Sequence, residues 1–302
     1  MTEDERQLAV EGAQRMRVGA LAVLAGFMLF AGDLWASAVE SSSPTVGLLQ
    51  GLNPALHGLA AAHTDPRTLG LRFLVHDQLP LLAASLVAAL GAVAMTFPLR
   101  YLAAAERART TTTPSAVTGY LALYAPLVIA IFVPAFEISL IVGAHSYLSG
   151  SARTASAVSA ATGGGLRVAL QLIVTVGELA LAAAFLLISM RAMRVGLLTR
   201  MLGIVGMISG VLFVIPLTPL PVVQALWLVF IGAMFVGFGG RQLPEAWSVL
   251  EARPWPSQPR AERRPRQQRA PRGSRSAPPP APEPVVQRGP SPSASKKRKR
   301  RR

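Results

Sequence analysis

Six apolar segments recur along the first 240 residues of the chain, and a polar segment rich in arginine follows them. The apolar segments cover Val18–Leu34, Leu81–Phe97, Leu121–Val142, Val168–Met190, Met201–Leu217 and Val222–Phe238. Because an α-helix rises about 1.5 Å per residue, about 20 apolar residues cross the hydrocarbon core of a bilayer. The pattern therefore predicts an all-α integral membrane protein whose fold is a bundle of six transmembrane helices.

The same pattern divides the chain into three parts. Residues 1–17 form a polar N-terminus, residues 18–240 form the transmembrane domain, and residues 241–302 form a C-terminal tail rich in arginine and proline. The largest predicted segment between two spans is the loop of residues 36–78. The tail contains few apolar residues and cannot bury a core, so we expect it to be disordered.

The positive charge of the chain is concentrated in the tail. The formal net charge is +15, yet residues 1–240 hold 13 Lys/Arg against 11 Asp/Glu, whereas residues 241–302 hold 17 against 4. Outside the last seven residues every cation is arginine, which, with the many alanines, glycines and prolines, is typical of a GC-rich bacterial gene. The chain has no cysteine, which excludes disulfides and thiolate chemistry.

Arginines flank the apolar segments unequally, and this asymmetry predicts the orientation. Cytoplasmic flanks of transmembrane helices carry an excess of Lys and Arg. One set of flanks holds nine arginines, namely Arg6, Arg15, Arg17, Arg100, Arg107, Arg109, Arg191, Arg194 and Arg200. The opposite set holds four, namely Arg67, Arg72, Arg153 and Arg167. We therefore expect a multi-pass protein of the plasma membrane with both termini in the cytoplasm.

The first apolar segment has a second interpretation. Arg15 and Arg17, the apolar run and the small residues Ala36–Ala38 resemble a secretory signal peptide with its cleavage site. The residues before the run are acidic, which favours a retained first helix. Cleavage would leave five spans with their orientation unchanged.

Two carboxylates lie inside predicted spans, where a buried charge is costly and usually faces the bundle interior. Glu137 lies about 10 Å below Ala144, which we take as the outer end of its span, and Glu178 lies about 16 Å below Arg167 at the start of its own, so the two depths differ by about 6 Å. We expect the two side chains to meet in a polar site, with Gln171, Thr175 and His145 nearby. Close carboxylates tend to share a proton, which would suit proton-coupled transport or cation binding. The alternative is that each carboxylate orients its own helix.

The sequence does not favour catalysis. It contains no H-E-x-x-H, G-x-S-x-G or phosphate-binding loop motif, and its four histidines are scattered. We therefore expect no enzymatic activity, no cofactor and no metal site.

The chain ends in seven consecutive basic residues, Lys296, Lys297, Arg298, Lys299, Arg300, Arg301 and Arg302. On a cytoplasmic tail this run predicts binding to anionic lipid head groups, worth about 1 kcal/mol per residue near the surface. An acidic protein partner is the alternative. Nucleic acid is not an expected partner, because no aromatic residue after Trp255 is present to stack on bases.

The stretch Gly177–Val214, centred on Met190-Arg191-Ala192-Met193-Arg194-Val195-Gly196-Leu197-Leu198-Thr199-Arg200-Met201-Leu202-Gly203-Ile204, carries a resemblance. A span that ends near a glycine and a basic turn that opens the next span resemble a bacterial multi-pass family of unknown function. The resemblance implies the membrane architecture and assigns no activity to any residue. We therefore expect a binding, scaffold or regulatory protein, with a small-solute or proton-coupled transporter using Glu137 and Glu178 as the alternative.

Overall fold

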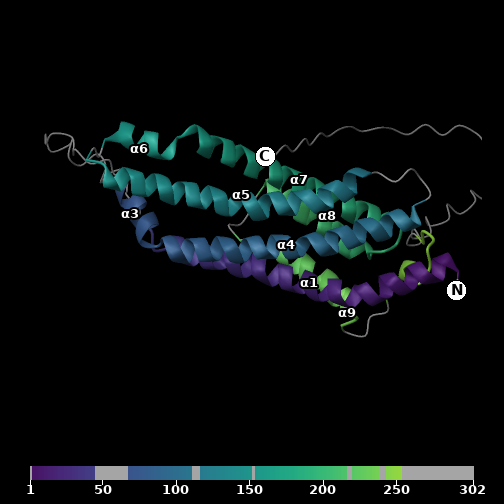
Figure 1. The fold of residues 1–302 in the computed structure, drawn as a ribbon. Coiled ribbons are helices and arrows are strands. Elements are labelled where there is room, and N and C mark those ends of the chain that lie inside the picture. Colours follow the sequence, from purple (N-terminus) through teal and green to yellow (C-terminus); the bar gives the residue numbers. More distant parts are fainter. Residues whose placement is uncertain are drawn as a thin grey trace, which may run out of the picture. The chain divides into compact units, whose positions relative to one another are not determined.

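The computed structural model describes residues 2–44, 67–110, 116–151, 154–215, 220–238 and 243–253, which belong to one compact unit, Met1–Trp255. The described residues are helical and contain no strand. The helices are α1 (Glu3–Glu40), α3 (Thr68–His76), α4 (Gln78–Arg109), α5 (Ala116–Ser149), α6 (Ala155–Thr162), α7 (Gly165–Arg194), α8 (Arg200–Val214) and α9 (Val222–Val236), followed by the 3₁₀ turn η1 (Glu245–Trp247) (Figure 1).

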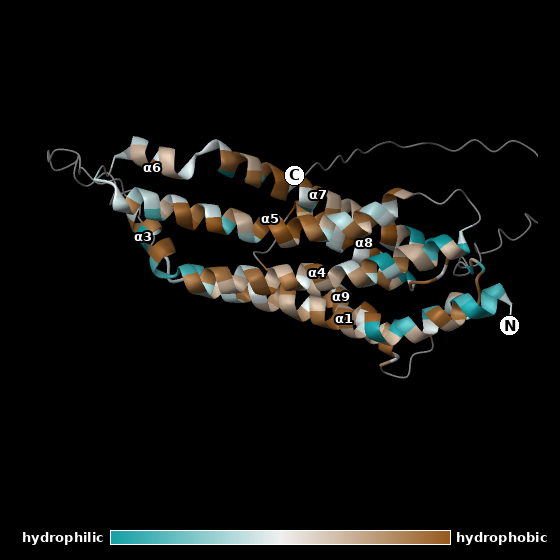
Figure 2. Ribbon diagram, viewed as in Figure 1, coloured by the Kyte–Doolittle hydropathy of each residue, from teal (hydrophilic) through white to brown (hydrophobic). Residues whose placement is uncertain are grey.

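Four helices, α1, α4, α5 and α7, are long and apolar enough to cross a membrane. They contain the first four predicted spans, so this part of the prediction is confirmed. Each helix is longer than its apolar run because it continues into polar residues at its ends, as the teal ends of α1 and α4 show (Figure 2). Thr2 caps the first turn of α1 through a reciprocal pair of hydrogen bonds with Glu5.

The six-span prediction is not confirmed for the last two segments. Helices α8 and α9 contain 15 residues each, which gives a length of about 22 Å against a hydrocarbon core of about 30 Å. The cause is local: Pro216 disfavours helical geometry at Ile215, and Pro221, which has no backbone N–H, occupies the N-cap position of α9. Mean hydropathy does not reveal where the prolines end these helices, because proline is only mildly polar.

Glycines allow α1 to pack closely between α4 and α9. Gly32 lies against the backbone of α4, and Gly19 and Gly26 lie against the backbone of α9, where a Cβ atom would clash with Gly232 and Ala225. In lipid, burying apolar side chains between helices yields no hydrophobic free energy, so helices associate mainly through close packing. Small residues such as glycine allow that close packing. The contacts of Gly19 with Gly232 and of Gly26 with Ala225 also set the register of the two helices. By this register α9 starts level with Leu29, and α1 continues for about 16 Å beyond that point.

Helix α8 packs against α7 through a similar row of glycines. Gly203 contacts Met193, Gly206 contacts Ser189, and Gly210 contacts the backbone of Ala182. Gly206 and Gly210 form a G-x-x-x-G pattern in the sequence, and in the structure both packing contacts are made within the chain. By this register Val214 lies near the level of Glu178–Leu181, and α7 continues for about 20 Å past the end of α8.

Large apolar side chains cover the outward faces of the helices. Each main helix contributes some that are about half exposed, among them Phe27, Leu90, Ile131, Val176, Ile208 and Phe230. The middle parts of the helices are mainly hydrophobic (Figure 2). An apolar belt that spans several helices is unfavourable in water and is matched by lipid tails. The belt therefore agrees with the membrane-spanning lengths of α1, α4, α5 and α7.

The two ends of the bundle differ. At the Tyr147 end, α3 and α6 pack against α5, and Tyr147 shares a buried hydrogen bond of 2.7 Å with Thr68 (Figure 1). Part of the predicted loop 36–78 is therefore helical, as is part of the next loop at that end. At the Arg109 end, the first turns of α1, the last turns of α4 and the α7–α8 turn come together with η1. The predicted disorder of residues 241–302 falls outside the described residues, except at residues 243–253.

Candidate functional sites

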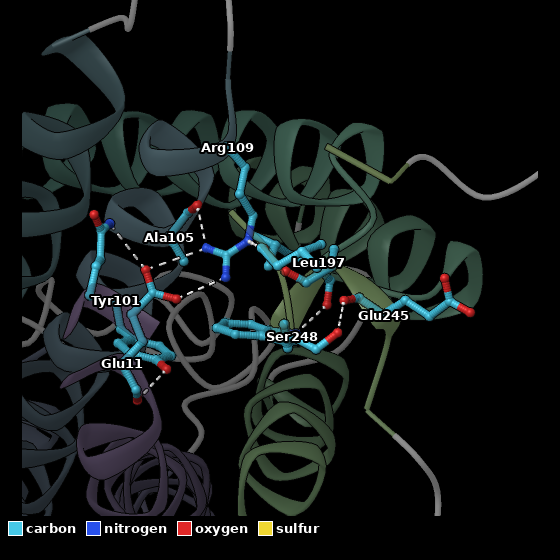
Figure 3. Close-up of polar contacts among 11 residues, drawn as sticks. Glu11, Tyr101, Ala105, Arg109, Leu197, Glu245 and Ser248 are labelled. Carbon is cyan, nitrogen blue, oxygen red and sulfur yellow. Dashed lines mark hydrogen bonds and ion pairs between the residues drawn. The ribbon is translucent and has the colours of Figure 1, made fainter. Parts of the chain in front are cut away.

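The first candidate site is centred on Arg109, at the end of α4. Its side chain is fully buried and reaches Glu11 of α1 at 2.9 Å in an ion pair (Figure 3). The same guanidinium donates from Nη1 to the carbonyl oxygen of Ala105 at 3.0 Å, and from Nε to those of Ala246 at 2.6 Å and Val249 at 3.1 Å. Arg109 thus joins two helices to the chain segment that follows α9.

Trp247 is the second anchor of that segment, and it is only 8% exposed. Its ring stacks on Tyr101 at 5.5 Å and meets Phe235 edge-on at 5.4 Å. The indole Nε1 donates to the carbonyl oxygen of Leu197 at 2.9 Å, in the α7–α8 turn. A tryptophan at this position is typical of the membrane interface, but here its surroundings are protein.

The α7–α8 turn completes the docking. Gly196 adopts a left-handed conformation with φ of 84°, which favours glycine, and a Cβ atom there would clash with the carbonyl of Arg253. The backbone N–H of Arg253 donates to the carbonyl of Val195 at 3.1 Å. We call residues 243–253 the docked segment, because Arg109, Trp247 and this turn hold it at three points.

A cavity forms the second candidate site, at the tip of the α8–α9 hairpin. Its volume is about 670 Å³, and its floor consists of the ends of α8 and α9. Its walls come from four helices, through Leu29 and Asp33 of α1, Ala88 and Ala89 of α4, Ile129 and Val133 of α5, and Glu178 and Leu181 of α7. The cavity exists because the hairpin stops short while these four helices continue.

Three polar side chains line this otherwise apolar cavity, namely Asp33, Glu178 and Gln224. Gln224 is 5% exposed. Within the part of the chain that the structure describes, none of the three makes a hydrogen bond or an ion pair. The cavity thus offers two carboxylates and an amide that have no partner among the described residues.

The structure does not place Glu137 beside Glu178. Gly177 packs against Val128, so nine residues of α5 separate the level of Glu178 from Glu137, about 13 Å along the axis. Glu137 has Coulomb interactions with Glu40 and Arg167. The expected depth difference of about 6 Å was too small, because it treated Ala144 and Arg167 as level. Arg167 lies instead over the ring of Phe136, at 5.4 Å.

The other predicted members of that polar site also lie apart from the cavity. Gln171 and Thr175 are exposed on α7, where the Thr175 hydroxyl donates to the Gln171 carbonyl at 3.0 Å. His145 is exposed near the end of α5 and shares a hydrogen bond of 3.0 Å with Gln78. Of the predicted site residues, Glu178 lines the cavity, and Asp33 of α1 lines it as well.

Sequence reasoning missed the role of Arg109 because its partners are distant in the chain. Glu11 lies 98 positions away and Ala246 lies 137 positions away. Arg109 contributed to the prediction only as one of nine flanking arginines. Gln224 carried a usable signal, since it is a polar residue at the start of an apolar helix, three residues after the last proline of a proline-rich turn.

Comparison with known proteins adds no further assignment, since no family model, curated protein or solved structure matches this chain.

Proposed function

We propose that this chain is a multi-pass protein of the bacterial plasma membrane that serves as a binding or scaffold component. In this proposal α1, α4, α5 and α7 span the bilayer, and α8 and α9 enter it as a hairpin from the cytoplasmic side. The six apolar segments then all lie in the membrane, and both termini are cytoplasmic. The resemblance of Gly177–Val214 to a family of unknown function agrees with this architecture and names no activity.

The distribution of arginine supports this orientation. The nine arginines of the richer set of flanks belong to the Arg109 end of the bundle, where Arg253 of the docked segment adds another. The Tyr147 end holds Arg67, Arg72 and Arg167 among the described residues. By the positive-inside rule the Arg109 end faces the cytoplasm.

The observation that carries the proposal is the docked segment. It leads directly into the basic tail, and Arg109 and Trp247 attach it to α1, α4, α9 and the α7–α8 turn. A bundle that fixes the start of a tail carrying most of the charge of the chain acts as a membrane anchor for that tail. We therefore propose that the tail, ending in Lys296–Arg302, binds anionic lipid head groups, with an acidic protein as the alternative partner.

The experiment uses full-length protein in liposomes of neutral lipid, mixed with labelled vesicles that contain an anionic lipid. Binding is read by co-flotation at low and at high salt. Seven cations near a surface are worth up to about 7 kcal/mol at low ionic strength, and salt screens them. We expect vesicle capture at low salt, and a steep loss when glutamine replaces all seven residues from Lys296 to Arg302.

A variant of equal charge serves as the matched control. It replaces seven upstream arginines by glutamine, namely Arg260, Arg263, Arg264, Arg266, Arg269, Arg272 and Arg275. Because these seven charges are spread over the 16 residues from Arg260 to Arg275 and not over seven consecutive residues, fewer of them lie within one Debye length of each other, about 8 Å, and we expect a smaller loss of capture than from the terminal run. Capture that is unchanged in both variants, or capture that resists high salt, would contradict binding of the basic tail to anionic lipid.

Transport of a small solute or of protons is the second candidate, and the cavity at Glu178 is the observation that favours it. Flux into proteoliposomes should then be lost in Glu178→Gln. The transport hypothesis drawn from the sequence uses Glu178 together with Glu137, and it requires an equal loss of flux in Glu137→Gln. Retained flux in Glu137→Gln would leave Glu178 without that partner.

A further inference from the structure

The cavity at the hairpin tip has the chemistry of a binding site for one class of ligand. We propose that it binds a monovalent organic cation with an apolar body, held between Asp33 and Glu178. This inference does not depend on the tail or on its partner. It follows from the volume and the lining of the cavity, and from polar groups there that have no partner in the described part of the chain.

The size and the lining indicate a small organic molecule. A volume of about 670 Å³ falls within the range of roughly 300–1,000 Å³ that is usual for such sites. Of the fifteen described residues that line the cavity, twelve are apolar. An apolar wall of this extent fits a hydrocarbon or aromatic body better than it fits a hydrated metal ion.

The charge of the lining indicates a cation. Asp33 and Glu178 come from two different walls, and no described lysine or arginine lines the cavity. The charged side chain that has a Coulomb interaction with Asp33 is Glu40, which is also an acid. A carboxylate in an apolar site is stabilised by an opposite charge close to it, so a cation in the cavity supplies what the protein does not.

Gln224 provides an independent sign of a ligand. Its side chain is 5% exposed, it lines the cavity, and it has no hydrogen-bond partner among the described residues. Polar groups inside native proteins usually have a hydrogen-bond partner, and the accessible surface that this amide keeps faces the cavity. The amide lies on α9, at the floor of the cavity, where its oxygen can accept a hydrogen bond from a bound ammonium group or water.

Two probe ions of the same shape and opposite charge test the proposal on full-length protein in detergent. Tetraphenylphosphonium and tetraphenylborate have similar size and apolar surface, so a difference between them reports the sign of the site. Equilibrium dialysis should give saturable binding of tetraphenylphosphonium at one site per chain. Tetraphenylborate should show no saturable binding, and equal binding of both ions would overturn the proposal.

Variants then locate the site. The double variant Asp33→Asn/Glu178→Gln should lower the affinity for tetraphenylphosphonium by about tenfold or more, because two charges lose their Coulomb attraction in a site of low dielectric. Glu137→Gln is the matched control, since it removes an intramembrane carboxylate outside the cavity, and it should leave the affinity unchanged. Equal loss in both proteins, or none in the double variant, would contradict the proposed location.

A steric variant keeps the test decisive if the double variant fails to fold. Ala89 lines the cavity from α4, so Ala89→Phe fills part of the volume and leaves both carboxylates in place. We expect this variant to lose saturable binding of tetraphenylphosphonium as well. Unchanged affinity in Ala89→Phe would show that the ion binds elsewhere and would overturn the proposal.

Discussion

Replacing Arg109 by methionine tests how the docked segment is held. The substitution keeps an apolar side chain of similar length but removes the donors to the carbonyls of Ala246 and Val249, at 2.6 and 3.1 Å. A hydrogen bond to a charged group is worth about 1.5–3 kcal/mol. Undocking exposes both carbonyls to water, so we expect docking to weaken by about 3 kcal/mol.

The chain has no cysteine, so one introduced thiol reports undocking without background. Ala246 is 1% exposed in the docked segment, and a thiol placed by Ala246→Cys should react with a maleimide only when the segment opens. A loss of about 3 kcal/mol raises the open population by about 100-fold, and the rate of labelling with it. We expect that increase in Ala246→Cys/Arg109→Met over Ala246→Cys alone.

Arg107 supplies the matched control, because it lies in the same last turn of α4 and is exposed. Arg107→Met should leave the labelling rate close to that of the parent. Arg109→Lys should give an intermediate rate, since lysine keeps the charge but not the planar fork of donors. Labelling of the Arg109→Met protein as slow as that of the parent would refute the role we give to this side chain.

Two further predictions concern the packing of α1 and α9. Gly26→Ala places a methyl group against the carbonyl of Ala225 and should lower stability by about 1–3 kcal/mol. Gly12→Ala meets no atom within 4 Å and should raise stability slightly. Melting in detergent measures both, and equal shifts would contradict the close approach. Trp227→Phe loses the 2.9 Å hydrogen bond to the carbonyl of Leu202 and should cost about 1 kcal/mol in the same assay. No change would show that this bond is dispensable.

The four long helices could be predicted from the sequence because each carries an apolar run of sufficient length. The lengths of α8 and α9 could not be predicted from hydropathy alone, since the run Met201–Leu217 is apolar beyond the point where Pro216 ends the helix. The proline-rich turn was visible in the sequence. Its effect on the depth of the hairpin, and hence the cavity, depends on the register against α1 and α7, which the sequence does not contain.

The candidate sites show the same limit. Glu178 could be singled out from the sequence as a carboxylate within a long apolar run, and that property needs no knowledge of its neighbours. Its pairing required the relative heights of α5 and α7, and these depend on contacts such as Gly177 with Val128. Arg109 shows the opposite case, because its burial is created by residues from α1 and from the docked segment. The local sequence does not distinguish an arginine that flanks a span at the surface from one that is buried beneath a docked segment.

The orientation of the bundle in a membrane is the central claim, and one labelling experiment tests it most directly. Single cysteines are introduced by Ser149→Cys at the Tyr147 end and by Ser248→Cys at the Arg109 end, since both serines are exposed. A maleimide that does not cross membranes is added to intact cells and to permeabilised cells. We predict that the Ser149→Cys protein is labelled in both and the Ser248→Cys protein only after permeabilisation. Labelling of both variants in intact cells, or of neither, would contradict a bundle that spans the membrane with its Arg109 end inside.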